Sequence, residues 1–365
     1  MLTKADDYPI HQTPEPIAFA GTDRNFYDRY FFNGYDREGE LFFAAALGVY
    51  PQLNVMDASF SVIHDGKQHN VHASKTLHME RLDTQVGPIE IEVLEPLRVL
   101  SVTCDDPEHG IHADVQFTAR VPAIEEPRFT RKQGSQTVMD ITRLTQNGTY
   151  TGEVRVGDQH FKLDPAKFWG TRDRSWGIRS VGMRDPQTNP YGGTPQFFWL
   201  WAPLNFEDYA TFYHLNADGD GAPWNTMGRL ASATDSAESQ NVTSRIDYEP
   251  GTRHARHASL EFTALNGNDL TIELTPQTTF YMKGLGYGHA EWGHGLYHGE
   301  LETGYDTIDL ATVSKTDPTH FHIQALCAAT LKGLGKERRG QGVLEQLAIG
   351  PFAPYGFKEL MDVAE

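Results

Sequence analysis

Residues 152–163, GEVRVGDQHFKL, hold two short runs in which hydrophobic and polar side chains alternate, and Gly157 and Asp158 separate the runs. Alternation with a period of two places one set of side chains in a core and the other toward solvent, which is typical of a β-strand. A Gly-Asp pair between two such runs is typical of the tight turn in an antiparallel hairpin. The stretch therefore predicts two antiparallel strands joined by a short turn.

The same pattern recurs along the chain. Residues 260–274 predict a second hairpin, residues 30–44 predict strand–turn–strand, and residues 89–93 and 112–121 alternate as single strands. The 34 glycines and 20 prolines suit many short turns. We therefore expect a mostly β protein of antiparallel strands, arranged as two β-barrels or sandwiches side by side.

Residues 184–195 contain three prolines and two glycines, a composition that favours a connector over a strand. This segment predicts a division into an N-terminal domain, residues 1–183, and a C-terminal domain, residues 184–365. Stretches with helical spacing are few and short. The helical candidates are residues 342–349, residues 355–363 and a segment near Arg29.

Charge and composition exclude several classes of protein. Among 365 residues, Lys and Arg total 31 and Asp and Glu total 49, which gives a net charge of −18. Such an excess of acidic groups argues against binding to nucleic acid or to an anionic membrane surface. Hydrophobic residues make up 39% of the chain, which is enough for a packed core.

The sequence also predicts where the protein resides. Its first residues show no apolar stretch of a secretory signal, and the longest hydrophobic run, residues 41–50, is about half the length of a membrane span. Two cysteines, Cys104 and Cys327, are too few for a disulfide scaffold and are expected to be buried thiols. We expect a soluble cytoplasmic protein, and a homodimer is one assembly that the sequence leaves open.

Residues 169–179, WGTRDRSWGIR, place three arginines around one aspartate between two tryptophans. On a strand, Asp173 would face one side, and Arg172, Arg174 and Trp176 would face the other. One interpretation is an Arg–Asp network that ties two sheets together, with Trp176 in the core. The other is a carboxyl group held in an aromatic pocket, where burial raises its pKa more than the arginines lower it.

Residues 284–300, GLGYGHAEWGHGLYHGE, concentrate histidines among glycines. If this is a strand, His289 and Glu291 share one face whereas His294 and His298 share the other, so we expect no metal site. The glycines also lack the arrangement of a dinucleotide-binding loop. The segment predicts a glycine-rich strand that a ligand can approach closely, with satisfied core histidines as the alternative.

Residues 197–203, FFWLWAP, and 209–214, YATFYH, supply more flat aromatic side chains than a core of this size requires. They predict a cavity for a lipophilic or aromatic ligand, with Trp199 and Trp201 as candidates for its wall. The sequence contains no nucleophile elbow, P-loop or Cys-x-x-Cys motif, so nothing supports a serine hydrolase, an NTPase or a dithiol redox enzyme.

Residues 149–179 resemble the hydroxyneurosporene synthase (carotenoid 1,2-hydratase) and AttH-like superfamily. Three further segments resemble a bacterial branch of this superfamily. They are GYGHAEWGHG at 286–295, GVLEQ at 342–346 and GPFAPYGF at 350–357. The resemblance covers most of residues 25–357. It implies two lipocalin-like antiparallel β-barrel domains packed side by side, with few short helices. It also implies relatives that hydrate an isolated alkene, or that fold a polyene in a pericyclic reaction, without a cofactor.

In the hydratase branch, a Tyr-x-Asp element followed by a glycine four residues after the aspartate carries the acid. Asp173 and Gly177 match this pattern, whereas Thr171 stands at the tyrosine position. The His-x-Trp element that precedes it in that branch has no counterpart here. The resemblance therefore implies acid chemistry at Asp173 rather than carotenoid hydration itself.

Residues and resemblance together predict a cofactor-independent lyase or isomerase of the hydratase–dehydratase type, acting on a hydrophobic terpenoid-like or aromatic molecule. Asp173 is the expected general acid, because a carboxyl kept neutral by apolar surroundings can protonate an alkene or a leaving hydroxyl group. His289 would shuttle the proton or hold water, and Arg172 or Arg179 would tune Asp173. Aromatic faces would stabilise a carbocation-like centre. Tyr287 completes the catalytic candidates, which also include Asp173, His289 and Arg172. The binding candidates are Trp176, Trp292, Arg179, Glu291, His294, Trp199 and Trp201.

Two alternatives remain open at this stage. The chain could be a non-catalytic, lipocalin-like carrier of a hydrophobic ligand, in which case replacing Asp173 by Asn would change nothing measurable. It could also be a pericyclase- or cyclase-type scaffold, in which pocket shape matters more than any acid. An acid-dependent lyase would instead lose turnover and keep ligand binding on the same substitution.

Overall fold

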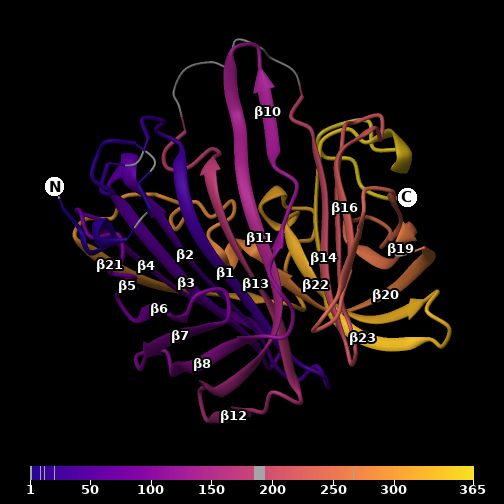
Figure 1. The fold of residues 1–365 in the computed structure, drawn as a ribbon, viewed down its shortest axis with the longest axis horizontal. Coiled ribbons are helices and arrows are strands. Elements are labelled where there is room, and N and C mark those ends of the chain that lie inside the picture. Colours follow the sequence, from indigo (N-terminus) through magenta and orange to yellow (C-terminus); the bar gives the residue numbers. More distant parts are fainter. Residues whose placement is uncertain (1, 9, 12, 20, 185–193, 266) are drawn as a thin grey trace.

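The computed structural model describes residues 2–8, 10–11, 13–19, 21–184, 194–265 and 267–365, and it confirms a mostly β protein built of two curled antiparallel sheets (Figure 1). The described helices are all short 3-10 turns. They are η1 (Lys4–Asp7), η2 (Pro51–Leu53), η3 (Met282–Leu285), η4 (Pro318–His320) and η5 (Ala353–Tyr355).

The first sheet has 14 strands within the described ranges, in the order β21-β4-β3-β2-β1-β13-β11-β8-β7-β6-β5, and β9, β10 and β12 also pair with β11. Its hairpins include the predicted one at 152–163 and the predicted strand–turn–strand at 30–44. The strands are β1 (Phe26–Asp36), β2 (Phe42–Tyr50), β3 (Val55–His64), β4 (Lys67–Thr76), β5 (Gln85–Val86), β6 (Ile89–Glu95), β7 (Val99–Asp106), β8 (Ile111–Ala119), β9 (Ile124–Glu125), β10 (Phe129–Gln133), β11 (Gln136–Val156), β12 (Gln159–Leu163), β13 (Phe168–Ile178) and β21 (Leu301–Asp309).

The second sheet has nine strands among the residues described, in the order β17-β16-β15-β14-β23-β22-β20-β19-β18. It curls until β17 contacts β19, close to its other edge. The strands are β14 (Phe197–Phe206), β15 (Ala210–Ala217), β16 (Pro223–Ala231), β17 (Ser236–Ser239), β18 (Val242–Tyr248), β19 (Ala255–Leu265), β20 (Asn268–Tyr281), β22 (Ile323–Lys332) and β23 (Arg338–Ile349).

Among the described residues, buried hydrophobic side chains form three large clusters and two small ones, one of which includes the pocket residues Tyr27, Phe129 and Ile141. Each curled sheet encloses its own core, with Phe43 and Phe117 in the first and Leu260 and Phe262 in the second. A third cluster, which includes Phe31, lies between the sheets. It joins β1, β2 and β13 to β14, β22 and β23, and this inter-sheet layer contains the site described below.

Two predicted helices are wrong. Residues 342–349 belong to β23, and the segment near Arg29 belongs to β1. Near Arg29, buried and half-buried residues alternate as in a strand. β23 is instead buried on both faces: Val343 faces the inter-sheet layer and Leu344 faces the barrel core. Hydrophobic residues on both faces hide the period of two, and the run then resembles the apolar side of a short helix.

Two further predictions also differ from the structure. Only η5 forms near residues 355–363, because the chain turns back after it and Phe352 pairs with Phe357. The glycine-rich segment 284–300 is not a strand but a series of turns after η3. Its glycines allow these turns, because Gly286 and Gly299 have φ of 94° and 90°, a region that other residues rarely adopt.

The division at residue 183 stays a prediction, and most of the expected connector, 185–193, lies outside the described residues. One strand crosses the division: β21 comes from the C-terminal half and pairs with β4 of the first sheet. Cys104 and Cys327 are both buried free thiols. None of the described helices is long and apolar enough to cross a membrane.

Candidate functional site

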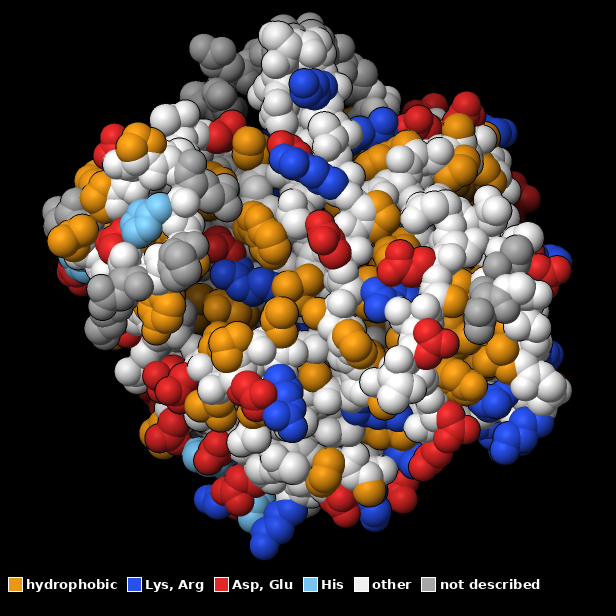
Figure 2. Space-filling model, in the orientation of Figure 1, with side chains coloured by type: hydrophobic (Ala, Val, Ile, Leu, Met, Phe, Trp, Pro, Cys, Tyr) orange, Lys and Arg blue, Asp and Glu red, His pale blue; other side chains and the backbone are white. Residues whose placement is uncertain are grey.

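A cavity of about 140 Å³ lies in the inter-sheet layer, at the base of the β10–β11 hairpin that extends beyond the sheets in Figure 1. Hydrophobic side chains also gather in the hollow between the two halves on the face drawn in Figure 2. Rings and aliphatic side chains form most of the cavity wall. The polar side chains in it are Arg143, Asp173, Ser175, Arg179, His322 and Glu345.

Asp173 reaches this pocket because β13 alternates. Asp173 and Ser175 point into the inter-sheet pocket, whereas the arginines beside them point the other way. The Asp173 carboxyl accepts no hydrogen bond from any residue that the structure describes. Burial raises its pKa to about 7, Arg143 and Arg29 oppose that shift, and Glu126 and Glu345 add to it. Asp173 is therefore a carboxylic acid that stays protonated up to neutral pH, which suits a proton donor.

The other residues of this segment lie away from the pocket. Arg172 Nε donates to Gln146 Oε1 (2.9 Å), and its guanidinium lies over Phe117 in the first core. Trp176 is 38% exposed on the opposite face of β13 from Asp173. The structure thus brings neither of these two candidates to the pocket, although the predicted alternation of faces is correct.

A histidine and a glutamate from the second sheet face the same pocket. His322 Nε2 donates to Glu345 Oε1 (2.5 Å), and Gln324 Nε2 donates to Glu345 Oε2 (2.7 Å). Because both oxygens of Glu345 accept hydrogen bonds, the carboxylate fixes the orientation of the His322 ring. The Nδ1 atom of His322 makes no hydrogen bond within the described residues, so it is available to a ligand.

Buried amides tie this pair to the first sheet. Asn33 Nδ2 donates to Gln324 Oε1 (3.0 Å), and the backbone N–H of Thr171 donates to Asn33 Oδ1 (2.9 Å). The chain of hydrogen bonds from β13 through β1 to β22 is fully buried. It holds the two sheets, and therefore Asp173 and the His322–Glu345 pair, in a fixed relation.

Arg143 enters the pocket from β11, in the same register as Met139 and Ile141. Its guanidinium lies over the rings of Phe129 (5.1 Å) and Trp199 (5.0 Å). Burial lowers the pKa of Arg143, but the nearby carboxyl groups of Glu126 and Asp173 outweigh this effect and raise the pKa above its usual value. Arg143 is thus a permanent cation among aromatic rings.

Glu126, the carboxyl group beside Arg143, is held by Trp201, one of the two tryptophans predicted for the cavity wall. Trp201 is fully buried outside the pocket, and its indole N–H donates to Glu126 Oε1 (3.0 Å). Thr145 Oγ1 donates to the same oxygen (2.5 Å). Trp199, in contrast, lines the pocket. The two tryptophans proposed for the cavity wall therefore differ: one lies in the wall, and the other supports it from behind.

The candidates of the glycine-rich segment divide between two places. Tyr287 lines the pocket, and its hydroxyl accepts a hydrogen bond from Arg29 Nη1 (3.0 Å). His294 lies behind the pocket: its Nε2 donates to the Leu285 carbonyl (2.7 Å), so its Nδ1 accepts from Arg179 Nη2 (3.1 Å). Burial lowers the pKa of His294 well below its ordinary value. His294 is therefore a neutral residue that positions Arg179 at the pocket.

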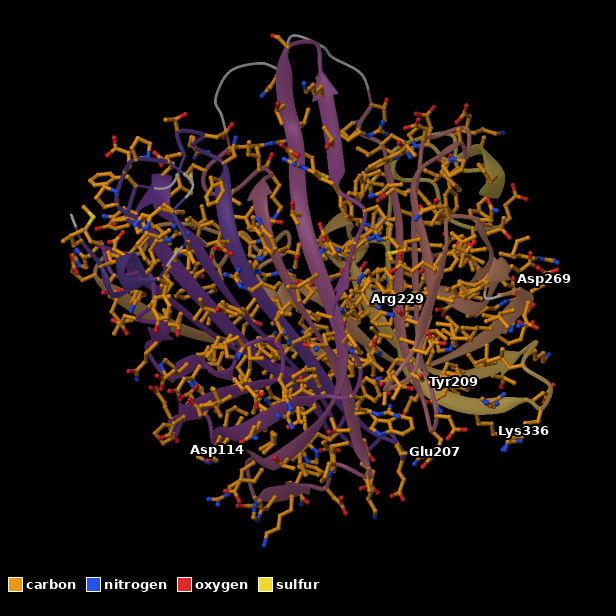
Figure 3. The ribbon with its side chains drawn as sticks, in the orientation of Figure 1. Asp114, Glu207, Tyr209, Arg229, Asp269 and Lys336 are labelled. Atoms are coloured by element: carbon orange, nitrogen blue, oxygen red, sulfur yellow. The ribbon has the colours of Figure 1, made fainter. Side chains whose placement is uncertain are left out.

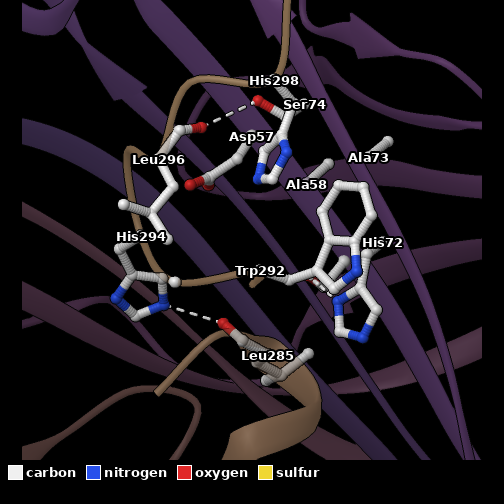
Figure 4. Close-up of a pocket in the computed structure, with 12 residues that line it drawn as sticks. Asp57, Ala58, His72, Ala73, Ser74, Leu285, Trp292, His294, Leu296 and His298 are labelled. Carbon is white, nitrogen blue, oxygen red and sulfur yellow. Dashed lines mark hydrogen bonds between the residues drawn. The ribbon is translucent and has the colours of Figure 1, made fainter. Parts of the chain in front are cut away.

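His289, Glu291 and Trp292 lie elsewhere, around β4 and β21. Trp292, His72, His294 and His298 surround a much smaller cavity of about 10 Å³ (Figure 4), which is close to the volume that one water needs. The Trp292 ring stacks on His72, with ring centres 5.5 Å apart. Glu291 is exposed. The structure does not bring these three candidates to Asp173.

His72, His289 and Asp306 place their ligand atoms within 4.8 Å of one another, which is close enough to share an ion. The hydrogen bonds do not fit a metal on His289, however. Its Nδ1 accepts the backbone N–H groups of Glu291 (3.2 Å) and Trp292 (2.9 Å), so Nε2 carries the proton that it donates to Asp306 (2.8 Å). A metal on Nε2 would require a proton on Nδ1, facing two N–H donors. That the protein needs no metal stays a prediction.

A larger groove of about 300 Å³ lies at Tyr209 and Leu334 of the second sheet (Figure 3 labels Tyr209). Its carboxyl groups, Asp208 and Asp235, are exposed. None of the candidate residues lines it. The inter-sheet pocket is the site at which buried titratable groups and rings meet.

Arg143, His322 and Glu345 were missed by reasoning from the sequence. Glu345 lay in a run that was predicted to be a helix, and it was not considered as a site residue. The sequence did hold a signal for Arg143, because a charged residue follows Met139 and Ile141 on the same face of the strand. His322 left no signal, because it follows η4 in an irregular segment that only the fold brings to Glu345.

A family described as a family of unknown function, DUF8625, matches residues 2–358. The chain belongs to this family. No curated protein matches the sequence.

Solved structures share the fold of this DUF8625 member at low identity. An AttH-like protein from Nitrosomonas europaea has a TM-score of 0.55 at 12% identity, with 93% of this chain and 98% of that chain covered. Kievitone hydratase from Nectria haematococca has a TM-score of 0.54 at 11% identity, covering 88% of each chain. CghA, solved with Sch210972, has a TM-score of 0.55 at 10% identity, covering 89% of each chain. The fold is thus the lipocalin-like one that the sequence motifs imply.

Proposed function

We propose that this protein is a lyase or isomerase of the hydratase–dehydratase type that acts on an apolar small molecule in the inter-sheet pocket. One observation carries the proposal: Asp173, a carboxyl group without a hydrogen bond in the described structure, and the His322–Glu345 pair face one apolar pocket from opposite sheets. The shared fold with a protein named kievitone hydratase supports the same class of reaction.

The residues present can perform both halves of a hydration. Asp173, protonated below about pH 7, gives its proton to one carbon of an alkene, and a carbocation-like centre forms on the other carbon. His322 Nδ1 removes a proton from water as the water oxygen bonds to that centre, so H and OH are added in total. Proton exchange with solvent then restores Asp173 and His322. Dehydration is the same sequence in reverse: protonated His322 gives its proton to the leaving hydroxyl group, and the Asp173 carboxylate removes a proton from the neighbouring carbon.

The walls of the pocket suit such a reaction. Phe31 and Phe197 also line the pocket, and no arginine of the described residues lies over either ring, so their faces can stabilise positive charge that develops on a substrate. Proton transfer between side chains, water and substrate needs no redox cofactor. We therefore extend the proposal to catalysis without a cofactor.

A shape-driven cyclisation is the second candidate. It is favoured by the predominance of rings and aliphatic side chains in the pocket wall. In that case the pocket would act by holding a substrate in one conformation, and Asp173 would be dispensable.

Incubation of the protein in H₂¹⁸O with prenylated phenols and monoterpene alcohols, followed by mass spectrometry, tests the proposal. We expect ¹⁸O incorporation that falls about 10²–10⁴-fold in Asp173→Asn, the usual contribution of a general acid. Asp114→Asn is the matched control, because Asp114 is exposed on β8, far from the pocket (Figure 3). The rate should also fall as the pH rises through about 7, where Asp173 ionises. Full activity of folded Asp173→Asn would refute the acid and favour the shape-driven alternative.

A further inference from the structure

Four hydrogen-bond donors at the inter-sheet pocket have no acceptor in the described structure. Nε and Nη1 of Arg143 are buried without a hydrogen bond, and so is Nε1 of Trp199. The Tyr287 hydroxyl accepts from Arg29, which leaves its own hydrogen free to donate. Buried donors normally have acceptors, so a cluster of open donors at one cavity indicates that a ligand supplies the acceptor.

The neighbouring carboxylate does not fill this role. Glu126 Oε2 is 3.6 Å from Arg143 Nη1, which is an ion pair but too long for a hydrogen bond. Oε1 of Glu126 is already held by Thr145 and Trp201. Glu126 thus balances part of the charge of Arg143 and leaves the N–H groups open.

The Arg143 side chain is also held ready for a ligand. It is 11% exposed, and the rings of Phe129 and Trp199 fix the plane of its guanidinium. Arg179, which His294 positions, adds a second cation to the pocket wall. A rigid, incompletely bonded guanidinium with a second cation nearby favours a negatively charged oxygen.

We propose that the pocket binds a molecule whose apolar body carries an oxyanion, either a carboxylate or an ionised enol, and that Arg143 binds this oxyanion. The inference names the substrate class of the acid–base site and so rests on the function proposed above. The cavity of about 140 Å³ is close to the ~150 Å³ that encloses one benzene ring. Near the oxyanion, the substrate therefore carries one ring or a branched alkyl group of similar size.

A matched pair of probes tests the charge directly. trans-Cinnamate and trans-cinnamamide have nearly the same shape, and only the first carries an oxyanion. We expect calorimetry at pH 6 to show that the wild-type protein binds cinnamate about tenfold more tightly than cinnamamide. In Arg143→Met this preference should disappear, while the affinity for cinnamamide stays within about threefold. Arg143→Lys, which keeps the charge but loses the planar fork, should retain part of the preference.

Arg128→Met is the control, because it removes the same charge from an exposed arginine that binds Asp140 outside the pocket. Equal affinity of the wild-type protein for both probes would overturn the proposal without any variant. A preference that survives in folded Arg143→Met would overturn it as well, and so would the absence of binding of both probes at millimolar concentration. Because binding is measured without turnover, the oxyanion site can fail while the ¹⁸O assay succeeds, and the reverse.

Discussion

At the scale of single residues, function and stability oppose each other at Asp173. Burial holds its pKa at about 7, so the folded protein binds a proton there that the unfolded chain, with a carboxyl pKa of 3.8, has already lost. Between these two values, stability falls as the pH rises, because the folded state binds more protons than the unfolded state. Above pH 7 the folded protein carries the whole cost of an ionised, poorly solvated carboxylate.

Asp173→Asn should therefore stabilise the protein at high pH. We expect the free energy of unfolding at pH 8 to rise by about 2 kcal/mol, a value reduced for water that reaches the open pocket. At pH 4 the two proteins should differ little. Thermal melts at both pH values check this, with Asp114→Asn as the surface control. A mutant that melts earlier than wild type at pH 8 would show that Asp173 is a structural anchor.

At the scale of strands, the site depends on how closely β1, β13 and β11 approach one another. A Cβ atom on Gly170 would lie 2.1 Å from the backbone oxygen of Asn33 and 2.6 Å from the Tyr150 ring. Asn33 is also the residue that connects β13 to Gln324 and Glu345. Glycine at position 170 thus allows the approach that aligns both sides of the pocket.

Gly170→Ala should lower the stability by about 1–3 kcal/mol, because the contact involves backbone that cannot rotate away. Gly219→Ala is a milder comparison, since its Cβ would lie 3.2 Å from the carbonyl oxygen of Pro351. Urea unfolding of both variants measures the difference. Equal stability of Gly170→Ala and wild type would contradict this close approach.

The sequence predicted these strands unevenly, and for a physical reason. Where one face of a strand is exposed, as in 152–163, the alternation of side chains is visible and the hairpin is predicted correctly. Where both faces are buried, as in β23, the alternation disappears and a helix was predicted instead. The candidate site follows the same rule. Asp173 was found because charged neighbours marked its segment, whereas Glu345 was hidden in a doubly buried strand.

At the scale of the whole molecule, the halves depend on each other. β21 from the C-terminal half forms an edge of the first sheet, and Phe31 and Trp201 pack edge to face across the inter-sheet layer, with ring centres 6.3 Å apart. No local pattern predicts such a crossing, because β21 finds its partner β4 more than 200 residues away along the chain. The turns that precede β21 also explain why Tyr287 lies at the inter-sheet pocket whereas His289 lies beside β4 and β21.

We therefore expect residues 1–183 alone to lack a cooperative unfolding transition. Separation from the second half exposes the apolar layer between the sheets and removes β21, which covers the edge of β4. Co-expression with residues 184–365 should restore the transition. Circular dichroism melts of the fragment, the pair and the full chain check this. A sharp transition of the isolated fragment would show instead that the predicted N-terminal domain folds independently.

The proposed function depends on one protonated carboxyl group in the inter-sheet pocket, Asp173, whose pKa can be measured directly. ¹³C NMR of protein labelled at the aspartate Cγ atoms, with Asp173→Asn to assign the signal, measures that pKa without any substrate. We expect a midpoint near 7, because burial raises the pKa to about 7. A midpoint at the ordinary value of about 3.9 would mean that Asp173 is ionised throughout the physiological range, and would contradict its role as the acid.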